Sequence, residues 1–405
     1  MTPARAYIAS RILYGMKFGL ETTRALAEEM GHPERAYPTL LIAGTNGKGS
    51  VVAYLDAALR ASGLRVGRYT SPHLVRVNER IVVDGREVQD RALDRAILGV
   101  RAAAGRLVSR RVLAQHPTYF EVLTLAAFEH FRRARVDVAL LEVGLGGRLD
   151  ATNVSEPLVS AIVSIGRDHE QYLGTTLASI AREKAGVMRP GRAIVVGALP
   201  RAAERTLRAA AQRVGARVVD AARSPQRLPA LGLDGEHQRA NARVALRVLQ
   251  EARRAGLRVR AGAIPAAFAA TRWPGRLHWI RGARPPLLLD GAHNPDGARA
   301  LARYLRGRRP FVLVFGVMGD KAVAGMARVL FPLAHALVLT QAPGDRAASP
   351  ETIARASGPA AGGARLEPSV PRALRLAARL TPPGGCVVVA GSLYLVGDVL
   401  KRLRP

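Results

Sequence analysis

The stretch Thr39–Ser50, TLLIAGTNGKGS, decides the fold class because it joins a buried strand to a helix through a glycine-rich turn. Its first five residues, Thr39–Ala43, form a short apolar run of the kind that makes a buried parallel strand. The segment Ser50–Ala61 has helical spacing and is closed by Gly63. Strand, turn and helix in this order predict an α/β protein.

The turn between this strand and helix has the composition of a phosphate-binding loop. Glycines allow backbone amides to converge on phosphate oxygens, and the start of the helix adds partial positive charge. Lys48 can reach the terminal phosphates of a nucleoside triphosphate, and Ser50 can approach its Mg²⁺. A tight turn without a ligand would need the glycines but no lysine. The residues predicted to bind the nucleotide are Gly44, Thr45, Asn46, Gly47, Lys48, Gly49 and Ser50. One departure from the usual loop is that Gly49 separates the lysine from the serine.

Apolar runs alternate with amphipathic segments along most of the chain, which is typical of α/β proteins. Further strands of a first series are expected at Val66–Tyr69, Val138–Val143, Val159–Ile165 and Ala193–Val196, with helices at Tyr119–Arg132 and Gln238–Ala255. A second series has strands at Leu287–Asp290, Phe311–Phe315, Ala336–Thr340 and Val387–Ala390, and helices at Asp296–Leu305, Lys321–Leu330, Pro350–Ala356 and Pro371–Leu380. We therefore expect a P-loop-containing doubly wound domain over residues 1–281 and a smaller Rossmann-like domain over residues 282–405.

Length and composition limit the classes of function. The chain has 405 residues, which suits two domains. Its 61 Lys and Arg residues against 31 Asp and Glu residues give a net charge of +30, but these cations are scattered and only 5 are lysines. No basic stripe with interleaved aromatics is found, so nucleic-acid binding is disfavoured. Cys386 is the only cysteine, which excludes an internal disulfide and fits a reducing cytoplasm.

Neither membrane insertion nor export is expected. No apolar run approaches the roughly 20 residues that span a bilayer, and the first residues have no signal-peptide core. We expect a cytoplasmic monomer that acts on small molecules.

Nine motifs in one order carry a resemblance to a known family. They are GTNGKGS, TSPHLVRVNER, TYFE, LLEVGLGGRLDATN, DHEQYLG, EKAGVMRPG, PGR, LDGAHNPDGARA and GDK. Together they cover most of the chain and resemble the folylpolyglutamate synthase/dihydrofolate synthase family of the Mur ligases. The resemblance implies a bifunctional ATP-dependent ligase with two Mg²⁺ sites. Such an enzyme activates the carboxyl group of dihydropteroate or a reduced folate as an acyl phosphate, which L-glutamate then attacks.

The resemblance also implies metal ligands. Glu142 ends an apolar run at the carboxyl end of a predicted strand, where open α/β sheets bind ligands, and a carboxylate there can hold Mg²⁺. A helix-cap or turn contact is the alternative. Ser50 and Ser71 are implied as further ligands of this metal. His169 is implied at a second Mg²⁺, although a single loop histidine is otherwise ordinary.

Lys184 is implied to be carbamylated, so that its side chain becomes a metal-binding carboxylate. Only an amine that can lose its proton reacts with CO₂, and a guanidinium effectively never does. Lysine at Lys48, Lys184 and Lys321, in a chain with 56 arginines, therefore suggests positions where arginine would not serve. A surface ion pair between Lys184 and Glu183 is the alternative.

Substrate and nucleotide contacts follow from the same resemblance. Residues implied at the pterin acceptor are Ser71, Thr118, Phe120, Asp150 and Ala151, and residues implied at the nucleotide are Asn241, Arg276, Asp290 and His293. A phenylalanine can stack on a flat pterin and a carboxylate can accept from its amino groups. Phe120 can equally belong to the core, Asp290 can cap a helix, and His293 and Arg276 can be ordinary turn and surface residues.

Three other functions remain open. A cell-wall Mur ligase shares the loop and the metals but carries an additional N-terminal domain, for which about 38 residues before the loop leave no space. A folylpolyglutamate synthase without the second activity is harder to exclude, although TYFE and GRLDATN favour the bifunctional form. A nucleotide-dependent RNA-binding protein would explain the positive charge.

Overall fold

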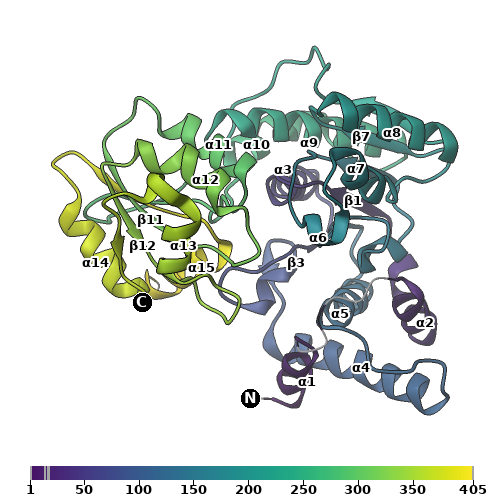
Figure 1. Cartoon of the computed structure of the whole chain (residues 1–405). Helices are drawn as coiled ribbons and strands as arrows, with labels where there is room; N and C mark the ends of the chain where they lie inside the picture. Colours follow the sequence, from purple (N-terminus) through teal and green to yellow (C-terminus); the bar gives the residue numbers. More distant parts are fainter. Residues whose placement is uncertain (1, 13–14, 16–18, 404–405) are drawn as a thin grey trace. The chain divides into compact units, whose positions relative to one another are not determined.

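The computed structural model describes residues 2–12, 15 and 19–403, which divide into two compact units (Figure 1). Unit 1 holds the described residues up to Ile165, then Leu177–Ala230 and Ala240–Thr271. Unit 2 holds Gly166–Thr176, Leu231–Arg239 and the described residues from Arg272 onward. The expected boundary between residues 281 and 282 falls inside unit 2, because the strand His278–Ile280 already pairs with the sheet of that unit.

Unit 1 is built on an eight-stranded mixed sheet in the order β4-β3-β2-β5-β1-β6-β7-β8. Its strands are β1 (Thr39–Ala43), β2 (Val66–Tyr69), β3 (Ile81–Val83), β4 (Arg86–Glu87), β5 (Val138–Glu142), β6 (Val159–Ile162), β7 (Ala193–Val196) and β8 (Arg217–Asp220). At one edge β3 pairs antiparallel with both β2 and β4, and the other pairings are parallel. The expected α/β class is therefore confirmed.

The direction of each crossover between strands determines which face of the sheet a helix of unit 1 covers. These helices include α1 (Pro3–Arg11), α2 (Glu21–Glu29), α3 (Lys48–Ala61), α4 (Asp90–Ser109), α5 (Tyr119–Ala134), α7 (Leu177–Ala185), α8 (Arg201–Val214) and α10 (Ile264–Ala270), and most of α9 (Glu236–Arg254). The chain moves from β1 to β2 through α3 and back from β2 to β5 through α5. Right-handed crossovers in opposite directions place α3 and α5 on opposite faces of the sheet.

The centre of this sheet is where a ligand is expected. The strand β1 lies between β5 and β6, and the chain leaves β1 first toward one side and later crosses to the other. Such a reversal leaves a crevice outside the carboxyl ends of the strands. All five residues of both β1 and β5 are buried, which agrees with a parallel sheet covered on two faces.

Unit 2 has a six-stranded sheet in the order β13-β12-β11-β14-β10-β9, in which only β9 runs antiparallel to its neighbour. Its strands are β9 (His278–Ile280), β10 (Leu287–Leu289), β11 (Phe311–Phe315), β12 (Ala336–Leu339), β13 (Arg365–Leu366) and β14 (Cys386–Ala390). Its helices include α6 (Glu170–Leu173), α11 (Pro295–Leu305), α12 (Val323–Leu330), α13 (Pro350–Ser357), α14 (Val370–Leu380) and α15 (Leu393–Leu403). Figure 1 shows α12, α13, α14 and α15 around β11 and β12.

Each unit has its own apolar core. In unit 2, Phe315, Met326 and Leu339 are fully buried in one cluster that joins the sheet to α12. Among the helices formed by the described residues, none is long and apolar enough to cross a membrane.

Candidate active site

The turn between β1 and α3 has a backbone that only glycine adopts easily. Gly44 and Gly47 have φ values of 149° and 85°. A Cβ atom at Gly47 would lie 2.4 Å from Asn241 Oδ1 and 2.8 Å from Val163 Cγ1. The ammonium group of Lys48 curls over the loop, with its Nζ 3.0 Å from the carbonyl oxygen of Gly44. The first amides of α3 lack intrahelical acceptors, so the loop has the donors and the cation that a phosphate chain needs.

Ser164 holds this loop in place, although the sequence analysis assigned it no role. Its Oγ accepts from the backbone N–H of Asn46 at 2.9 Å and donates to the carbonyl oxygen of the same residue at 2.9 Å. Its carbonyl oxygen accepts from the N–H of Thr45 at 2.9 Å. The sequence contains one signal for this role, because Ser164 is a polar residue that directly follows the apolar run of β6, the neighbour of β1.

The predicted metal ligands Glu142 and Ser71 come together at the carboxyl ends of neighbouring strands. Glu142 ends β5, and its Oε2 accepts from the backbone N–H of Ser71 at 3.2 Å. Glu142 also lies opposite Ile42 of β1, next to the phosphate loop. Ser50, which is 1% exposed, belongs to the first turn of α3. A carboxylate and hydroxyl groups are oxygen donors of the kind that Mg²⁺ prefers, so these residues fit the metal.

Lys184 lies in α7 and is only 4% exposed. The alternative contact with Glu183 is not favoured, because the Glu183 carboxylate forms its ion pair with Arg148 at 3.0 Å. Lys184 and Glu183 therefore have different surroundings.

The two motifs implied at the acceptor meet beside β2. Thr118 is the N-cap of α5, and its side chain and backbone N–H both donate to the Glu121 carboxylate at 2.8 Å. Phe120 packs against Tyr69 of β2, with ring centroids 5.9 Å apart. A Cβ atom at Gly144 would lie 2.6 Å from the Phe120 ring, so the close approach requires glycine there.

Asp150 is buried and accepts hydrogen bonds from the backbone around it. Its Oδ1 accepts from the N–H of Thr152 at 3.0 Å, and its Oδ2 accepts from the N–H of Leu145 at 2.9 Å. Burial raises the pKa of this carboxyl, and its hydrogen bonds only partly oppose the effect. Asp150 thereby fixes the loop under Phe120 and caps the short helix that starts at the buried Ala151.

In unit 2, the implied nucleotide residues Arg276 and Asp290 lie together. The Asp290 carboxylate accepts from the N–H groups of Leu277 and Ala292, each at 2.9 Å. The Arg276 side chain lies over Gly291, since a Cβ atom there would be 2.3 Å from Arg276 Nη1. Asp290 does not cap α11, because Asn294 accepts from the N–H of Gly297 in that role.

A charged cluster in unit 2 centres on Asp168, whose side chain is 8% exposed. Lys321 Nζ lies 2.6 Å from Asp168 Oδ1. His293 Nε2 lies 3.4 Å from Asp168 Oδ2, and Asn294 Nδ2 donates to the same oxygen at 3.0 Å. Burial raises the pKa of Asp168, but the hydrogen bond and charge of His293, followed by the charge of Lys321, outweigh it and hold the pKa well below its usual range. The cluster therefore contains an ionised carboxylate paired with the Lys321 ammonium, which also lies 3.6 Å from Asp320 Oδ2.

His169, the implied ligand of a second Mg²⁺, belongs to this cluster. Its Nε2 lies 3.4 Å from Lys321 Nζ, and it is grouped in unit 2, whereas Ser50, Ser71, Glu142 and Lys184 belong to unit 1. Within the described parts of the chain, no three His, Cys, Asp or Glu side chains form a group that could hold a metal ion.

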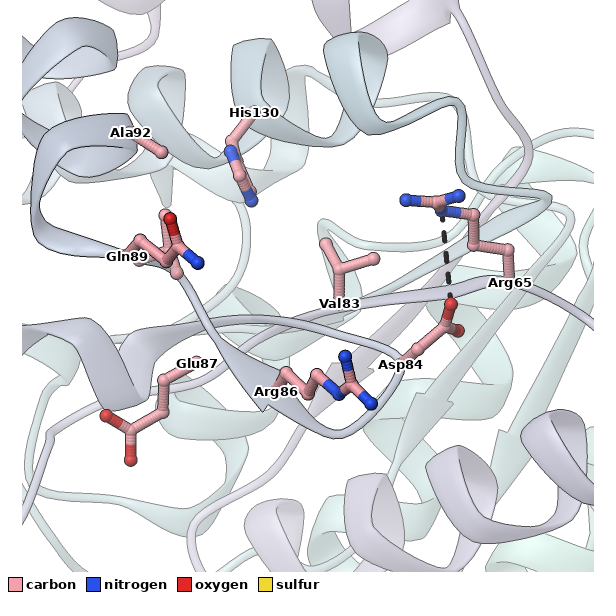
Figure 2. Close-up of a pocket in the computed structure, with 9 residues that line it drawn as sticks. Arg65, Val83, Asp84, Arg86, Glu87, Gln89, Ala92 and His130 are labelled. Carbon is pink, nitrogen blue, oxygen red and sulfur yellow. Dashed lines mark ion pairs between the residues drawn. The ribbon is translucent and has the colours of Figure 1, made fainter.

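A cavity of about 530 Å³ opens elsewhere in unit 1, beside the β3–β4 hairpin (Figure 2). Its lining includes Arg65, Asp84 and His130, and Figure 2 shows the Asp84 carboxylate turned toward the Arg65 guanidinium. Val83 pairs with Gly67 near the start of β2, so the cavity lies at the opposite end of the strands from Ser71. None of the implied site residues lines it.

Comparison with known proteins shows which family the chain is similar to. Residues 275–393 match a family model described as Mur ligase, glutamate ligase domain. The chain is 32% identical to a dihydrofolate synthase/folylpolyglutamate synthase of Bacillus subtilis, over 99% of this chain and 98% of that protein.

Two solved structures are similar over nearly the full length. One is Escherichia coli FolC in complex with DHPP and ADP, with a TM-score of 0.88, 30% identity, and 99% and 98% of the two chains covered. The other is a bifunctional folylpolyglutamate synthase/dihydrofolate synthase with Mn, AMPPNP and L-glutamate bound, with a TM-score of 0.88, 33% identity, and 100% and 99% covered.

Two α/β units, a phosphate loop and a match to the glutamate ligase domain define an ATP-dependent ligase of the Mur type. The chain belongs to the dihydrofolate synthase/folylpolyglutamate synthase family.

Proposed function

We propose that this chain adds L-glutamate both to dihydropteroate and to reduced folates, and that each addition passes through an acyl phosphate. The observation that carries the proposal is the phosphate loop with Lys48 folded over it, next to the paired Glu142 and Ser71. The bound DHPP, ADP, AMPPNP and L-glutamate of the similar structures support the same set of substrates.

The chemistry consists of two displacements. An oxygen of the acceptor carboxylate attacks the γ-phosphorus of ATP, and the bond to the bridging oxygen breaks to release ADP. The amine nitrogen of L-glutamate then attacks the acyl carbon, phosphate leaves, and the nitrogen loses its proton to solvent. No side chain becomes covalently modified in these steps. Lys48 and the amides of the loop position the transferring phosphate and stabilise its charge.

The divalent metal belongs with the residues at the ends of β1, β2 and β5. Ser50, Ser71 and Glu142 would hold Mg²⁺, which supplies charge neutralisation at the phosphates when bound. Lys184, in α7, is proposed as a further metal ligand. His169 is proposed for a second metal ion. We expect Lys184 to be carbamylated, because its buried amine lies in a helix of the same unit. Isotopically labelled CO₂ should give a carbamate signal in the wild type that Lys184→Ala lacks.

The remaining predicted site residues are proposed to bind either the acceptor or the nucleotide. Residues proposed at the acceptor are Ser71, Thr118, Phe120, Asp150 and Ala151, and those proposed at the nucleotide are Gly44 to Ser50, Asn241, Arg276, Asp290 and His293. Asn241 is supported by its position against Gly47 of the loop. We propose residues 1–281 and 282–405 as the two functional domains, with the strand His278–Ile280 of the first contributing to the sheet of unit 2.

We further propose that the enzyme works as a cytoplasmic monomer without a nucleic-acid partner. Cys386, which is buried in β14, and the scattered arginines are consistent with this setting. Light scattering would measure the mass in solution. Retention on a polyanion at physiological salt, combined with no glutamate-dependent phosphate release, would favour an RNA-binding function instead.

The deciding experiment is an ATPase assay with two acceptors. ADP formation that requires L-glutamate and proceeds with both dihydropteroate and tetrahydrofolate supports the bifunctional enzyme. Turnover of tetrahydrofolate alone would identify a folylpolyglutamate synthase without the second activity. No glutamate-dependent ADP with either acid would contradict the proposal.

A further inference from the structure

Arg80 is a buried cation at the acceptor side of unit 1. It is the last residue of the short helix Val77–Arg80, and 7% of its surface is exposed. Its carbonyl oxygen accepts from the N–H of Thr70 at 3.0 Å, which places it at the carboxyl end of β2, next to Ser71. Arg80 therefore lies beside the residues implied at the metal and the acceptor.

The protein orients the Arg80 side chain from two directions. Its Nε donates to His73 Nδ1 at 2.9 Å, and its guanidinium carbon lies 5.5 Å from the centroid of the Tyr119 ring. Tyr119 precedes Phe120 in α5, so Arg80 connects the Ser71–Arg80 loop to the TYFE motif. A planar guanidinium held in this way has a fixed direction for its remaining N–H groups.

The loop around Arg80 is itself rigidly built. Glu79 accepts from the backbone N–H groups of Leu74, Val75 and Arg76, at 2.7, 3.0 and 2.9 Å. The carboxylate next to Arg80 in the sequence is thus used by the loop backbone. Among the residues that the structure describes, no carboxylate forms an ion pair with Arg80 and no acceptor contacts its terminal amino groups.

A buried cation without an anionic partner is costly, so Arg80 is suited to bind an anion from a ligand. Carboxylates and phosphates both match a guanidinium fork. The phosphates of ATP already have Lys48 and the loop. Arg80 instead lies against the ring of Tyr119, which is next to Phe120 in α5, and such aromatic rings suit a flat organic acid. The chemistry at Arg80 therefore favours a carboxylate of the acceptor.

We propose that Arg80 binds a carboxylate of the pterin acceptor and determines the specificity of the site for acids. This inference rests on the proposed function, since it assigns a recognition residue to the acceptor of the same reaction. The role is binding and orientation of the acid.

The test measures two KM values, one for the pterin acceptor and one for ATP. Both are compared between the Arg80→Gln variant and the wild type. Loss of a charge-assisted bond predicts an acceptor KM that rises about 10- to 100-fold with either acid, at nearly unchanged KM for ATP. Arg80→Lys keeps the charge but loses the fork, so a smaller rise in the acceptor KM is expected. Arg308→Gln is the matched control, because Arg308 also stacks on a tyrosine, 4.0 Å from the Tyr304 centroid, but lies in unit 2.

Each outcome decides the inference. An unchanged acceptor KM in a folded Arg80→Gln, or a rise confined to the KM for ATP, would overturn it. If Arg80→Gln does not fold, Arg80→Lys decides, and a wild-type acceptor KM there would also overturn it. Failure of the proposed function is distinguishable, because the wild type itself would then form no glutamate-dependent ADP.

Discussion

The ammonium of Lys321 lies 2.6 Å from Asp168 Oδ1 and 3.4 Å from His169 Nε2, although these residues are more than 150 positions apart in the chain. A lysine thus lies beside His169, which the resemblance implies at a second metal ion. It also neutralises a carboxylate that is nearly buried. The GDK motif therefore contacts the first two residues of the DHEQYLG motif.

Replacing Lys321 by glutamine should destabilise unit 2. The change removes the charged partner of Asp168 and leaves its Oδ1 with the backbone N–H of His169 as its remaining donor, which costs about 1–3 kcal/mol. Chemical denaturation measures the free energy of unfolding, and Lys401→Gln on the exposed side of α15 is the control. Equal unfolding free energies for wild type and Lys321→Gln would show that the ion pair contributes nothing.

Replacing Gly47 by alanine should abolish most turnover without unfolding the protein. The new methyl group would meet Asn241 Oδ1 and Val163 Cγ1, and the residue would keep a positive φ. A displaced phosphate loop should lower kcat/KM by about 100-fold. Gly215→Ala is the matched control, because Gly215 has a φ of 73° but no atom within 4 Å of its Cβ position. Comparable activities of the two variants would argue against a tightly shaped loop.

Replacing Ser164 by alanine should weaken ATP binding. The variant loses both contacts between Ser164 Oγ and the backbone of Asn46. Two hydrogen bonds of about 1 kcal/mol each predict a KM for ATP that rises about 30-fold. Ser109→Ala removes a comparable hydroxyl that donates to a carbonyl on α4 and controls for the loss of a serine. A KM for ATP that stays at the wild-type value would show that the loop keeps its shape without Ser164.

The free energy of unfolding should decrease as the pH falls below neutrality, in part because of His130. Burial, followed by the charges of Arg133 and Arg65, lowers the pKa of His130 from its ordinary value of 6.5. As the pH falls below 6.5, the unfolded chain therefore binds a proton that the folded chain does not, and the free energy of unfolding decreases. His130→Gln should flatten this part of the pH profile, with a replacement at the exposed His335 as control. Parallel profiles for wild type and His130→Gln would contradict the assignment.

Much of the fold could be predicted because buried parallel strands are continuous apolar runs. β1, β2, β7 and β11 have the predicted bounds, whereas β4 and β13 are two exposed residues each and carry no such pattern. The meeting of Glu142 and Ser71 follows from the rule that carboxyl ends of parallel strands share an edge. The contacts of Asp168 with Lys321, and of Arg80 with Tyr119, depend on tertiary packing between distant segments, which one sequence does not encode locally.

The central claim is that the acceptor acid is activated as an acyl phosphate. The most direct measurement uses dihydropteroate with isotopically labelled oxygen in its carboxyl group and follows the label by mass spectrometry. Attack of that carboxylate on ATP predicts that one labelled oxygen appears in the inorganic phosphate released when L-glutamate is joined. Amide product accompanied by wholly unlabelled phosphate would contradict the account.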